Sequence, residues 1–339
     1  MAGRRTIGLG LFTGQQPAGV TRPPYRDAIT LARAAEASGF DAFWVSEHHG
    51  FPDGYLPSPF VLLGALAVTT DRLLLGAGVA LAPLHHPLRL AEDAAVVDQL
   101  SGGRLVLGLG LGYAEHEYAA FGVDTTRRGA VLSDLVPFLH RAWSGEAFDW
   151  SGPAYDGRGL RVTPHPVREG GVPIWLGGYA PGALRRARAL ADGHLIGRAD
   201  DAILDELLPA WAEPVDRPFT LAVNALVLLG DDPEDAAAAR AGYAAAQAAY
   251  ESVQAGGIAH AGLVAPDPAR PVEPDLVDRY MQAVGTPGTV TTALRALLDR
   301  LPRWADVHLV LRVLFPEPDV ARQVARVERL GREVLPRLR

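Results

Sequence analysis

One carboxylate and two imidazoles stand side by side in this chain, at Glu47, His48 and His49. They follow a largely apolar run, residues 40–46, that is typical of a buried strand. Histidine changes its protonation nearest to neutral pH, so the triplet could move protons in a reaction. Side chains alternate along a strand, so we expect His48 to point away from Glu47 and His49. The alternative is a structural cluster in which Glu47 fixes an imidazole beneath a loop.

Glycines interrupt a second apolar run, residues 72–80, at Gly76 and Gly78. Glycine weakens a buried strand unless the backbone must bulge or approach something closely. A flat ring lying on the backbone would explain both glycines, and so would ordinary packing inside a barrel. His85 and His86 come shortly afterwards, and both a packing role and a catalytic role are open for them.

Two further glycine-rich segments follow apolar runs. The segment 108–112 has the pattern G-x-G-x-G, which lacks the spacing of a dinucleotide-binding fingerprint. Gly177, Gly178 and Tyr179 connect a strand-like run to a helix-like one. Such a turn exposes backbone N–H groups at a helix N-terminus, where phosphate binds readily. An ordinary strand-to-helix turn is the alternative.

Composition excludes several classes of chemistry. The chain has no cysteine and no lysine, and all 32 basic residues are arginine. Disulfides, thiolate nucleophiles and Schiff-base lysines are therefore excluded. The net charge of −7 and the absence of a basic patch argue against a nucleic-acid partner.

Membrane and metal partners are also not expected. No apolar run approaches the ~20 residues of a membrane span, and no signal-peptide core is visible, so a cytoplasmic location is expected. The histidine triplet lacks the H-E-x-x-H spacing, so we predict no metal site.

Short apolar runs alternate with helix-like segments along the 339 residues. This alternation predicts an α/β fold with a parallel sheet covered on both faces. At this length a (β/α)8 TIM barrel is favoured over a doubly wound sheet. We expect a single domain, residues 1–339, with insertions near 145–165, a small hairpin, and near 256–275. The predicted strands are residues 6–11, 42–45, 72–80, 104–109, 174–176, 194–196, 220–229 and 307–313, and the predicted helices are 26–38, 60–67, 87–100, 131–143, 181–191, 233–254, 289–301 and 320–335.

Taken together, these segments resemble the bacterial luciferase-like monooxygenase family, which includes flavin- and deazaflavin-dependent oxidoreductases. Each segment alone is only moderately specific, but the ordered set is specific. The segments occur in the family's order and spacing from about residue 5 to residue 300. They are residues 39–49, 83–92, 97–104, 110–113, 121–124 and 284–287.

The resemblance implies a (β/α)8 barrel that binds reduced FMN at the carboxyl ends of its strands. In the family the flavin ring rests against a bulge in the third strand that contains a non-proline cis peptide, which would fall here between Gly78 and Val79. His48 would be the catalytic acid and base, with Glu47 and His49 as its catalytic-site supports. The cofactor-binding residues implied are Gly76, Gly78, Val79, His86, Gly112, Tyr113, Gly177, Gly178 and Tyr179.

The same resemblance implies an activity and its partners. We expect a flavin-dependent monooxygenase that takes reduced FMN from a separate flavin reductase and uses O2 to oxidise a small-molecule substrate. The family often forms homodimers through its early helices, so a homodimer is expected here.

The chain departs from the luciferases at two places. They have an arginine where this chain has Leu111, and hydroxyl and carboxylate side chains at Tyr179 and Ala180. Phosphate contacts must then come from backbone amides or from another arginine. A deazaflavin-dependent hydride-transfer oxidoreductase on the same fold is the first alternative, and a non-catalytic flavin-binding protein is the second.

Overall fold

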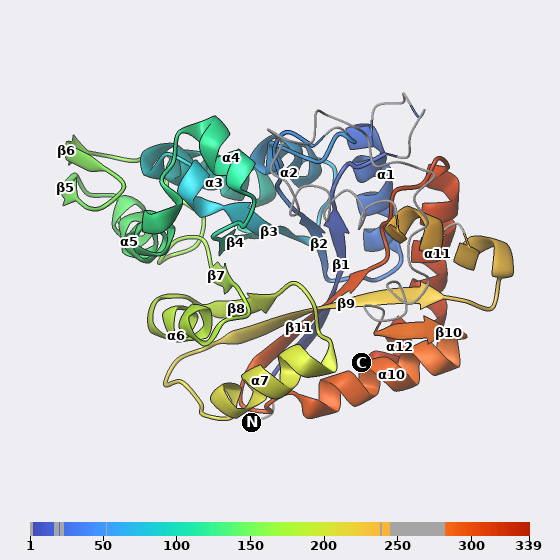
Figure 1. Ribbon diagram of the computed structural model, residues 1–339. Helices are drawn as coiled ribbons and strands as arrows, with labels where there is room; N and C mark the ends of the chain where they lie inside the picture. Colours follow the sequence, from blue (N-terminus) through green and yellow to red (C-terminus); the bar gives the residue numbers. More distant parts are fainter. Residues whose placement is uncertain (1–2, 17–19, 21–23, 52, 238, 245–281) are drawn as a thin grey trace.

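Eight parallel strands close into a barrel surrounded by helices in the computed structural model (Figure 1). The structure describes residues 3–16, 20, 24–51, 53–237, 239–244 and 282–339. Pairing of β1 with β11 and of β8 with β9 closes the ring, and every barrel pair is parallel. The predicted (β/α)8 barrel is therefore confirmed. Its strands are β1 (Arg5–Phe12), β2 (Ala42–Val45), β3 (Leu74–Leu81), β4 (Leu105–Gly110), β7 (Ile174–Gly177), β8 (Gly193–Ile196), β9 (Thr220–Leu229) and β11 (Asp306–Arg312).

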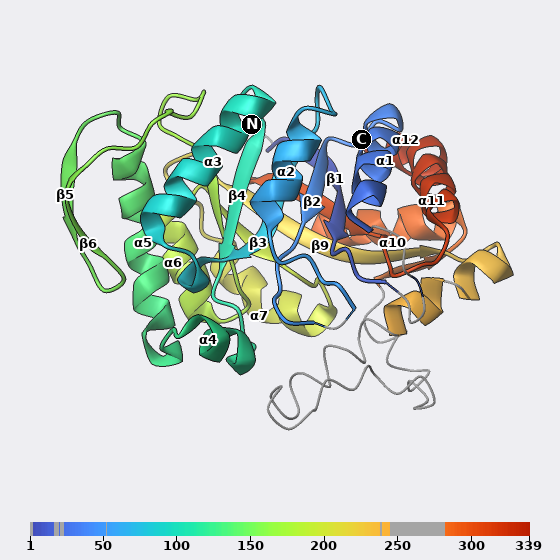
Figure 2. The same ribbon diagram turned by 90° about the horizontal axis from the view of Figure 1, so that it is seen from above.

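Helices cover the outside of the barrel, as the view from above shows (Figure 2). Proline, which suits the first helical turn, begins α2, α3, α6 and α10. In the part of the chain that the structure describes, none of the helices is long and apolar enough to cross a bilayer. The helices are α1 (Pro24–Ala37), α2 (Pro59–Ala67), α3 (Pro87–Ser101), α4 (Glu115–Phe121), α5 (Arg128–Ala142), α6 (Pro181–Leu190), α7 (Asp201–Trp211), α10 (Pro287–Arg300), α11 (Val320–Glu333) and α12 (Leu335–Leu338).

The two expected insertions have different outcomes. The first contains the antiparallel hairpin β5 (Phe148–Ser151) and β6 (Asp156–Leu160), as predicted. The second, residues 256–275, lies outside the described residues, as does the end of the helix expected over 233–254. The elements that were not predicted include α4, α7, α12 and a short strand, β10 (Ala283–Gly285), which pairs with the end of β9.

Two tryptophans and a histidine fill the interior of the barrel. Trp44 of β2 stacks on Trp175 of β7 with ring centroids 5.2 Å apart. The indole N–H of Trp44 donates to His308 Nε2 at 2.9 Å. Burial lowers the pKa of His308 to about 3, so the ring is neutral at pH 7. Its one proton must then be on Nδ1, which donates to the Thr6 hydroxyl at 2.6 Å.

Glycines on β1 and β3 make room for this interior layer. A Cβ at Gly76 would lie 2.2 Å from the Trp44 ring, and one at Gly10 would lie 2.6 Å from Trp44 Cβ. A Cβ at Gly78 would be 3.0 Å from the same ring. Ordinary barrel packing, one of the two explanations for the glycine-rich strand, therefore accounts for Gly76.

Candidate active site

The chain leaves β2 at Val45 and places Glu47, His48 and His49 directly beyond it, at the carboxyl end of the barrel. Glu47 and His48 are 2% and 7% exposed, so both are buried polar groups that need partners. Glu47 Oε1 accepts a hydrogen bond from His49 Nε2 at 3.0 Å. His48 has a different carboxylate as its partner. The side chains therefore diverge in the alternating way that the sequence predicts.

Glu47 connects the carboxyl ends of β2 and β3 through hydrogen bonds. Its carboxylate accepts the backbone N–H of Leu81 at 2.7 Å and His85 Nε2 at 3.0 Å, in addition to His49. Burial alone raises the pKa of Glu47, but hydrogen bonds from His49, His85 and Leu81 outweigh it and lower the pKa to about 2. Glu47 is therefore an anion at neutral pH, and its direct partners are His49 and His85.

His48 is held by Glu117, a residue that the sequence interpretation missed. His48 Nδ1 and Glu117 Oε1 are 2.9 Å apart, and the same oxygen accepts the backbone N–H of His49 at 2.7 Å. Glu117 is fully buried on α4, which begins just after β4 ends. A carboxylate accepts only, so His48 donates from Nδ1 and its Nε2 is the nitrogen that can take up a proton. The sequence offered one signal for Glu117: it is an acidic residue a few positions after the glycine-rich end of a predicted strand.

Aromatic rings enclose His48. The centroids of Phe51, Tyr55 and Tyr113 lie 5.2, 4.8 and 5.3 Å from that of the imidazole. Tyr113 is 41% exposed and forms the outer edge of this enclosure. The structure thus brings Tyr113, a predicted cofactor-binding residue, next to the predicted catalytic histidine.

The third strand bulges at the predicted position. The peptide bond between Gly78 and Val79 is cis, and the β3–β4 register shifts between Ala77 and Ala80. A second non-proline cis bond joins Gly10 and Leu11. The cis bond that the resemblance implied is therefore present.

Val79 occupies space that glycines on the neighbouring strands leave free. A Cβ at Gly110 of β4 would lie 2.5 Å from the Val79 side chain, and one at Gly177 of β7 would lie 2.8 Å from it. The side chain of Val79 is only partly buried and packs on the interior layer that contains Trp44. A partly open bed of backbone and one small apolar side chain fits a flat ring such as a flavin.

The turn after β7 is held rigidly. Gly178 has φ +147°, and a Cβ there would meet that of Ala183 at 2.6 Å. His194 Nδ1 accepts from the indole of Trp211 at 3.2 Å, so its Nε2 donates to the Gly178 carbonyl at 2.9 Å. Burial lowers the pKa of His194 to about 4, which keeps this ring neutral. The N-cap of α6, Ala180, has no capping side chain, so the turn fits a phosphate group.

Arginines supply positive charge near this turn. The charges of Arg198, just beyond β8, and Arg312, the last residue of β11, act on the hydroxyl of Tyr179. Arg198 also pairs with Asp200. Neither arginine was among the predicted residues, although the sequence led us to expect phosphate contacts from backbone amides or from another arginine.

The remaining predicted residues lie around the barrel mouth. Gly112 has φ +73°, a conformation that favours glycine, in the loop between β4 and α4. His86 is the N-cap residue of α3 and packs on Tyr155 of the hairpin segment with ring centroids 4.5 Å apart. Across the described ranges, no group of three or more His, Asp and Glu side chains is arranged to hold a metal ion.

Comparison with protein families adds to this geometry. The model of the family described as "Luciferase-like monooxygenase" matches residues 6–302. An F420-dependent glucose-6-phosphate dehydrogenase of Beutenbergia cavernae is 30% identical over 334 residues, which cover 93% of this chain and 94% of that protein. The oxygenase component of the flavin-dependent trigonelline monooxygenase of Acinetobacter baylyi is 31% identical over 159 residues. That match covers 46% of this chain and less than half, 44%, of the relative.

Solved structures share the fold. The oxygenating constituent of 3,6-diketocamphane monooxygenase from Pseudomonas putida, solved in complex with FMN, has a TM-score of 0.70 and 21% identity. The match covers 99% of both chains. The coenzyme F420-dependent tetrahydromethanopterin reductase of Methanopyrus kandleri has a TM-score of 0.75 and 19% identity, covering 99% of this chain and 100% of that one.

Proposed function

Because the chain belongs to the luciferase-like monooxygenase family, we propose that it is an oxidoreductase that binds a flavin at the carboxyl end of its barrel. More narrowly, it is a monooxygenase that uses reduced FMN and O2 to oxidise a small organic substrate. The observation that carries this proposal is the buried pair of His48 and Glu117, 2.9 Å apart, at the same barrel mouth as the bulge at Gly78 and Val79. The pair supports proton transfer, and the bulge supports a flat ring beside it.

The residues present fit this cofactor. Gly78 and Val79 form the bed for the ring, and Gly76 leaves room for the Trp44 indole that packs inside the barrel. Gly112, Tyr113 and His86 lie around the mouth. The turn at Gly177, Gly178 and Tyr179 receives the phosphate, with Arg198 and Arg312 contributing positive charge in place of the arginine that luciferases have. When bound, the reduced flavin supplies the electrons that activate O2.

His48 manages protons in this proposal. Glu117 fixes the imidazole through Nδ1, so Nε2 can accept a proton at the reacting centre and return it later. The buried carboxylate stabilises the ring while it is charged. Phe51, Tyr55 and Tyr113 keep water away, which protects a reactive oxygen species from decay.

Glu47 and His49 act one step away from the reaction. Glu47 fixes His49, His85 and the last residue of β3, Leu81, which aligns the ends of β2 and β3. We therefore assign both as positioning residues of the site, and His48 as the residue that contacts the reacting atoms.

Two partners follow from the proposal. A relative is named as the oxygenase component of a monooxygenase, which supports a separate flavin reductase as the source of reduced FMN. The second partner is another copy of the chain. Four apolar side chains on α2 and α3 or at their ends are exposed: Val61, Val68, Val96 and Leu100.

A deazaflavin-dependent hydride transfer is the second candidate function. It is favoured by the relative from Beutenbergia cavernae, whose match spans 93% of this chain. In that reaction the same barrel mouth would hold the coenzyme, and His48 would exchange a proton with the substrate oxygen while hydride moves. Oxygen would take no part.

An anaerobic titration separates the two functions. The protein is titrated with reduced FMN and with a reduced deazaflavin coenzyme, and O2 consumption is then followed. We expect FMN to bind at least tenfold more tightly and O2 to be consumed only with FMN. Tighter binding of the deazaflavin without O2 consumption would establish hydride transfer, and binding of neither would refute a cofactor site at this mouth.

A further inference from the structure

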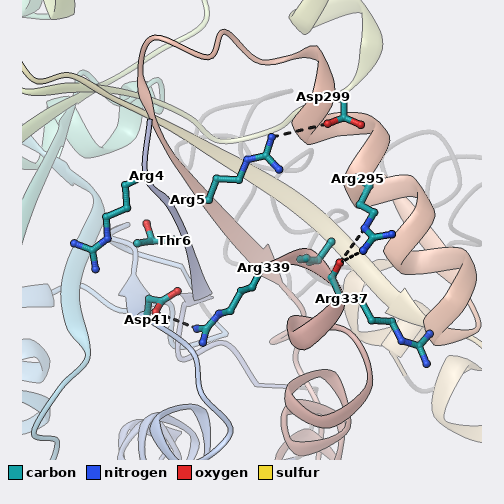
Figure 3. A pocket seen from close by; sticks show the side chains of 9 residues that line it. Arg4, Arg5, Thr6, Asp41, Arg295, Asp299, Arg337 and Arg339 are labelled. Atoms are coloured by element: carbon teal, nitrogen blue, oxygen red, sulfur yellow. Dashed lines mark hydrogen bonds and ion pairs between the residues drawn. The ribbon is translucent and has the colours of Figure 1, made fainter. Parts of the chain in front are cut away.

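A pocket of about 580 Å³ lies at the amino-terminal end of the barrel, opposite the site around His48. It is formed by the start of β1, the segment just before β2, and the helices α10 and α12 (Figure 3). Pockets of roughly 300–1,000 Å³ accommodate small-molecule ligands. The proposed flavin chemistry does not use this end of the molecule.

Arginine dominates the pocket lining. Arg4, Arg5, Arg295, Arg337 and Arg339 line it together with two aspartates, so positive side-chain charges exceed negative ones by three. The whole chain, in contrast, has a formal charge of −7. A concave surface lined by one sign of charge concentrates ligands of the opposite sign.

The two aspartates offset only part of the arginine charge. Asp41 accepts the backbone N–H of Ile7 at 2.7 Å and pairs with Arg339 at 3.1 Å, so its carboxylate is fully engaged. Asp299 lies 3.9 Å from Arg5, and their side chains are 71% and 47% exposed. Such an exposed and distant pair contributes little. Figure 3 shows both pairs among the side chains that line the pocket.

Backbone carbonyls orient two of the arginines, Arg295 and Arg339, and the second of these is also paired with Asp41. Arg295 donates from Nε and Nη2 to the carbonyl of Arg337, at 2.9 and 2.5 Å. Arg339 Nη2 donates to the carbonyl of Gly39 at 2.5 Å. Within the described ranges, no carboxylate lies within ion-pair distance of the side chains of Arg4, Arg295 or Arg337. A guanidinium that is already oriented loses less entropy when it binds an oxyanion.

We propose that this pocket binds a small polyanion that carries two or more phosphate or carboxylate groups. Bidentate contacts from arginine suit both groups. Separated arginines around a cavity of this size favour a ligand with several anionic groups over a single monovalent ion. The site is distinct from the flavin site, so the protein has two ligand sites at opposite ends of the barrel.

Calorimetric titration with inorganic pyrophosphate and with citrate, at constant ionic strength set with sodium chloride, tests the proposal. The pocket variant is Arg5→Gln combined with Arg295→Gln. The matched control is Arg89→Gln combined with Arg332→Gln, which removes two exposed arginines of α3 and α11 and changes the net charge equally. We expect the pocket variant to weaken binding at least tenfold and the control to change it less than twofold.

The two probes also distinguish the ligand chemistry. Tighter binding of pyrophosphate indicates a phosphate ligand, and tighter binding of citrate indicates a carboxylate ligand. If neither probe binds, or if both double variants bind equally well, the proposal is refuted. Should the pocket variant fail to fold because the Arg337 carbonyl loses its donors, Arg4→Gln alone is expected to weaken binding at least threefold, and an unchanged affinity would refute the site.

Discussion

Two buried carboxylates, Glu47 and Glu117, have different roles in the site. Glu47 binds His49 and His85 and holds the ends of two strands, whereas Glu117 binds His48 and the backbone of the same segment. Each role depends on burial, because a hydrogen bond between ionised groups is stronger where water is excluded. Two predictions at the residue scale separate the roles.

Replacement of Glu117 should affect the reaction through His48. We expect Glu117→Gln to lower the rate of substrate oxidation by about 10²-fold, because the imidazole loses the anion that stabilises its charged form. The exposed Glu115 on the same helix provides the control, Glu115→Gln. Equal rates in the two variants would contradict the role of Glu117.

Replacement of Glu47 should affect stability in a pH-dependent way. Its folded-state pKa of about 2 lies below the ordinary glutamate pKa of 4.5, so its stabilisation is present above pH 4.5 and is lost as the pH falls towards 2. We expect Glu47→Gln to lower the free energy of unfolding by about 2–3 kcal/mol at pH 6 and by much less at pH 3. Chemical denaturation at both pH values measures this.

The exposed Glu328 on α11 gives the control for that experiment. Glu328→Gln should change the free energy of unfolding by less than about 0.5 kcal/mol at either pH. A loss for Glu47→Gln that is the same at pH 3 and pH 6 would contradict the ionised state of Glu47.

At the scale of secondary-structure elements, a large side chain on β2 packs where β3 has a glycine. Trp44 of β2 fills the barrel beneath the bulge of β3, and Gly76 leaves the space that the indole needs. The same strand then carries the cis bond at Gly78 and Val79. Gly76 therefore makes room for the tryptophan that packs below the site, and Gly78 lies where the flavin ring is predicted to rest.

Substitution of Gly76 tests this match. We expect Gly76→Ala to lower the free energy of unfolding by about 1–3 kcal/mol, because its Cβ would lie 2.2 Å from the Trp44 ring. The control is Gly64→Ala on α2, where the nearest side-chain atom is 3.8 Å away. Alanine should stabilise that helix by about 0.5–1 kcal/mol. In a Trp44→Leu background Gly76→Ala should cost less, and an unchanged cost would show that the indole is not the reason for the glycine.

At the scale of the whole molecule, the barrel separates two ends with different charge. The carboxyl end holds the buried carboxylate–histidine pairs, and the amino-terminal end holds the arginine-lined pocket. The outer surface of α2 and α3 is apolar in part, with Val61 78% and Leu100 49% exposed. Exposed apolar groups that cluster on neighbouring helices favour association with another protein surface.

We expect the protein to form a homodimer through these two helices. Sedimentation velocity should give twice the mass of one chain, and Val61→Asp combined with Leu100→Asp should give a single-chain mass without loss of stability. Ala202→Asp, at an exposed side chain on α7, a helix separate from α2 and α3, is the control and should stay dimeric. A wild-type protein with the mass of one chain would contradict this surface as a dimer interface.

The sequence by itself determined the fold and the outline of the site. Strand and helix periodicity are local properties, so the eight apolar runs predicted the eight barrel strands, and the ordered motifs placed the cis bond at Gly78 and Val79. The alternation of side chains also predicted that His48 would diverge from Glu47 and His49. These inferences depend on neighbours in the chain, which a sequence displays directly.

Only the tertiary structure decided which groups meet. Glu117 reaches His48 from 69 positions along the chain. Trp44 and Gly76 come together only when the barrel closes, and so do Arg5 and Arg295. A lone glutamate, glycine or arginine has no periodicity that marks its partner, because barrel closure sets the distance between strands. The partner of His48 and the arginine pocket could therefore be found only once the strands and helices were in place.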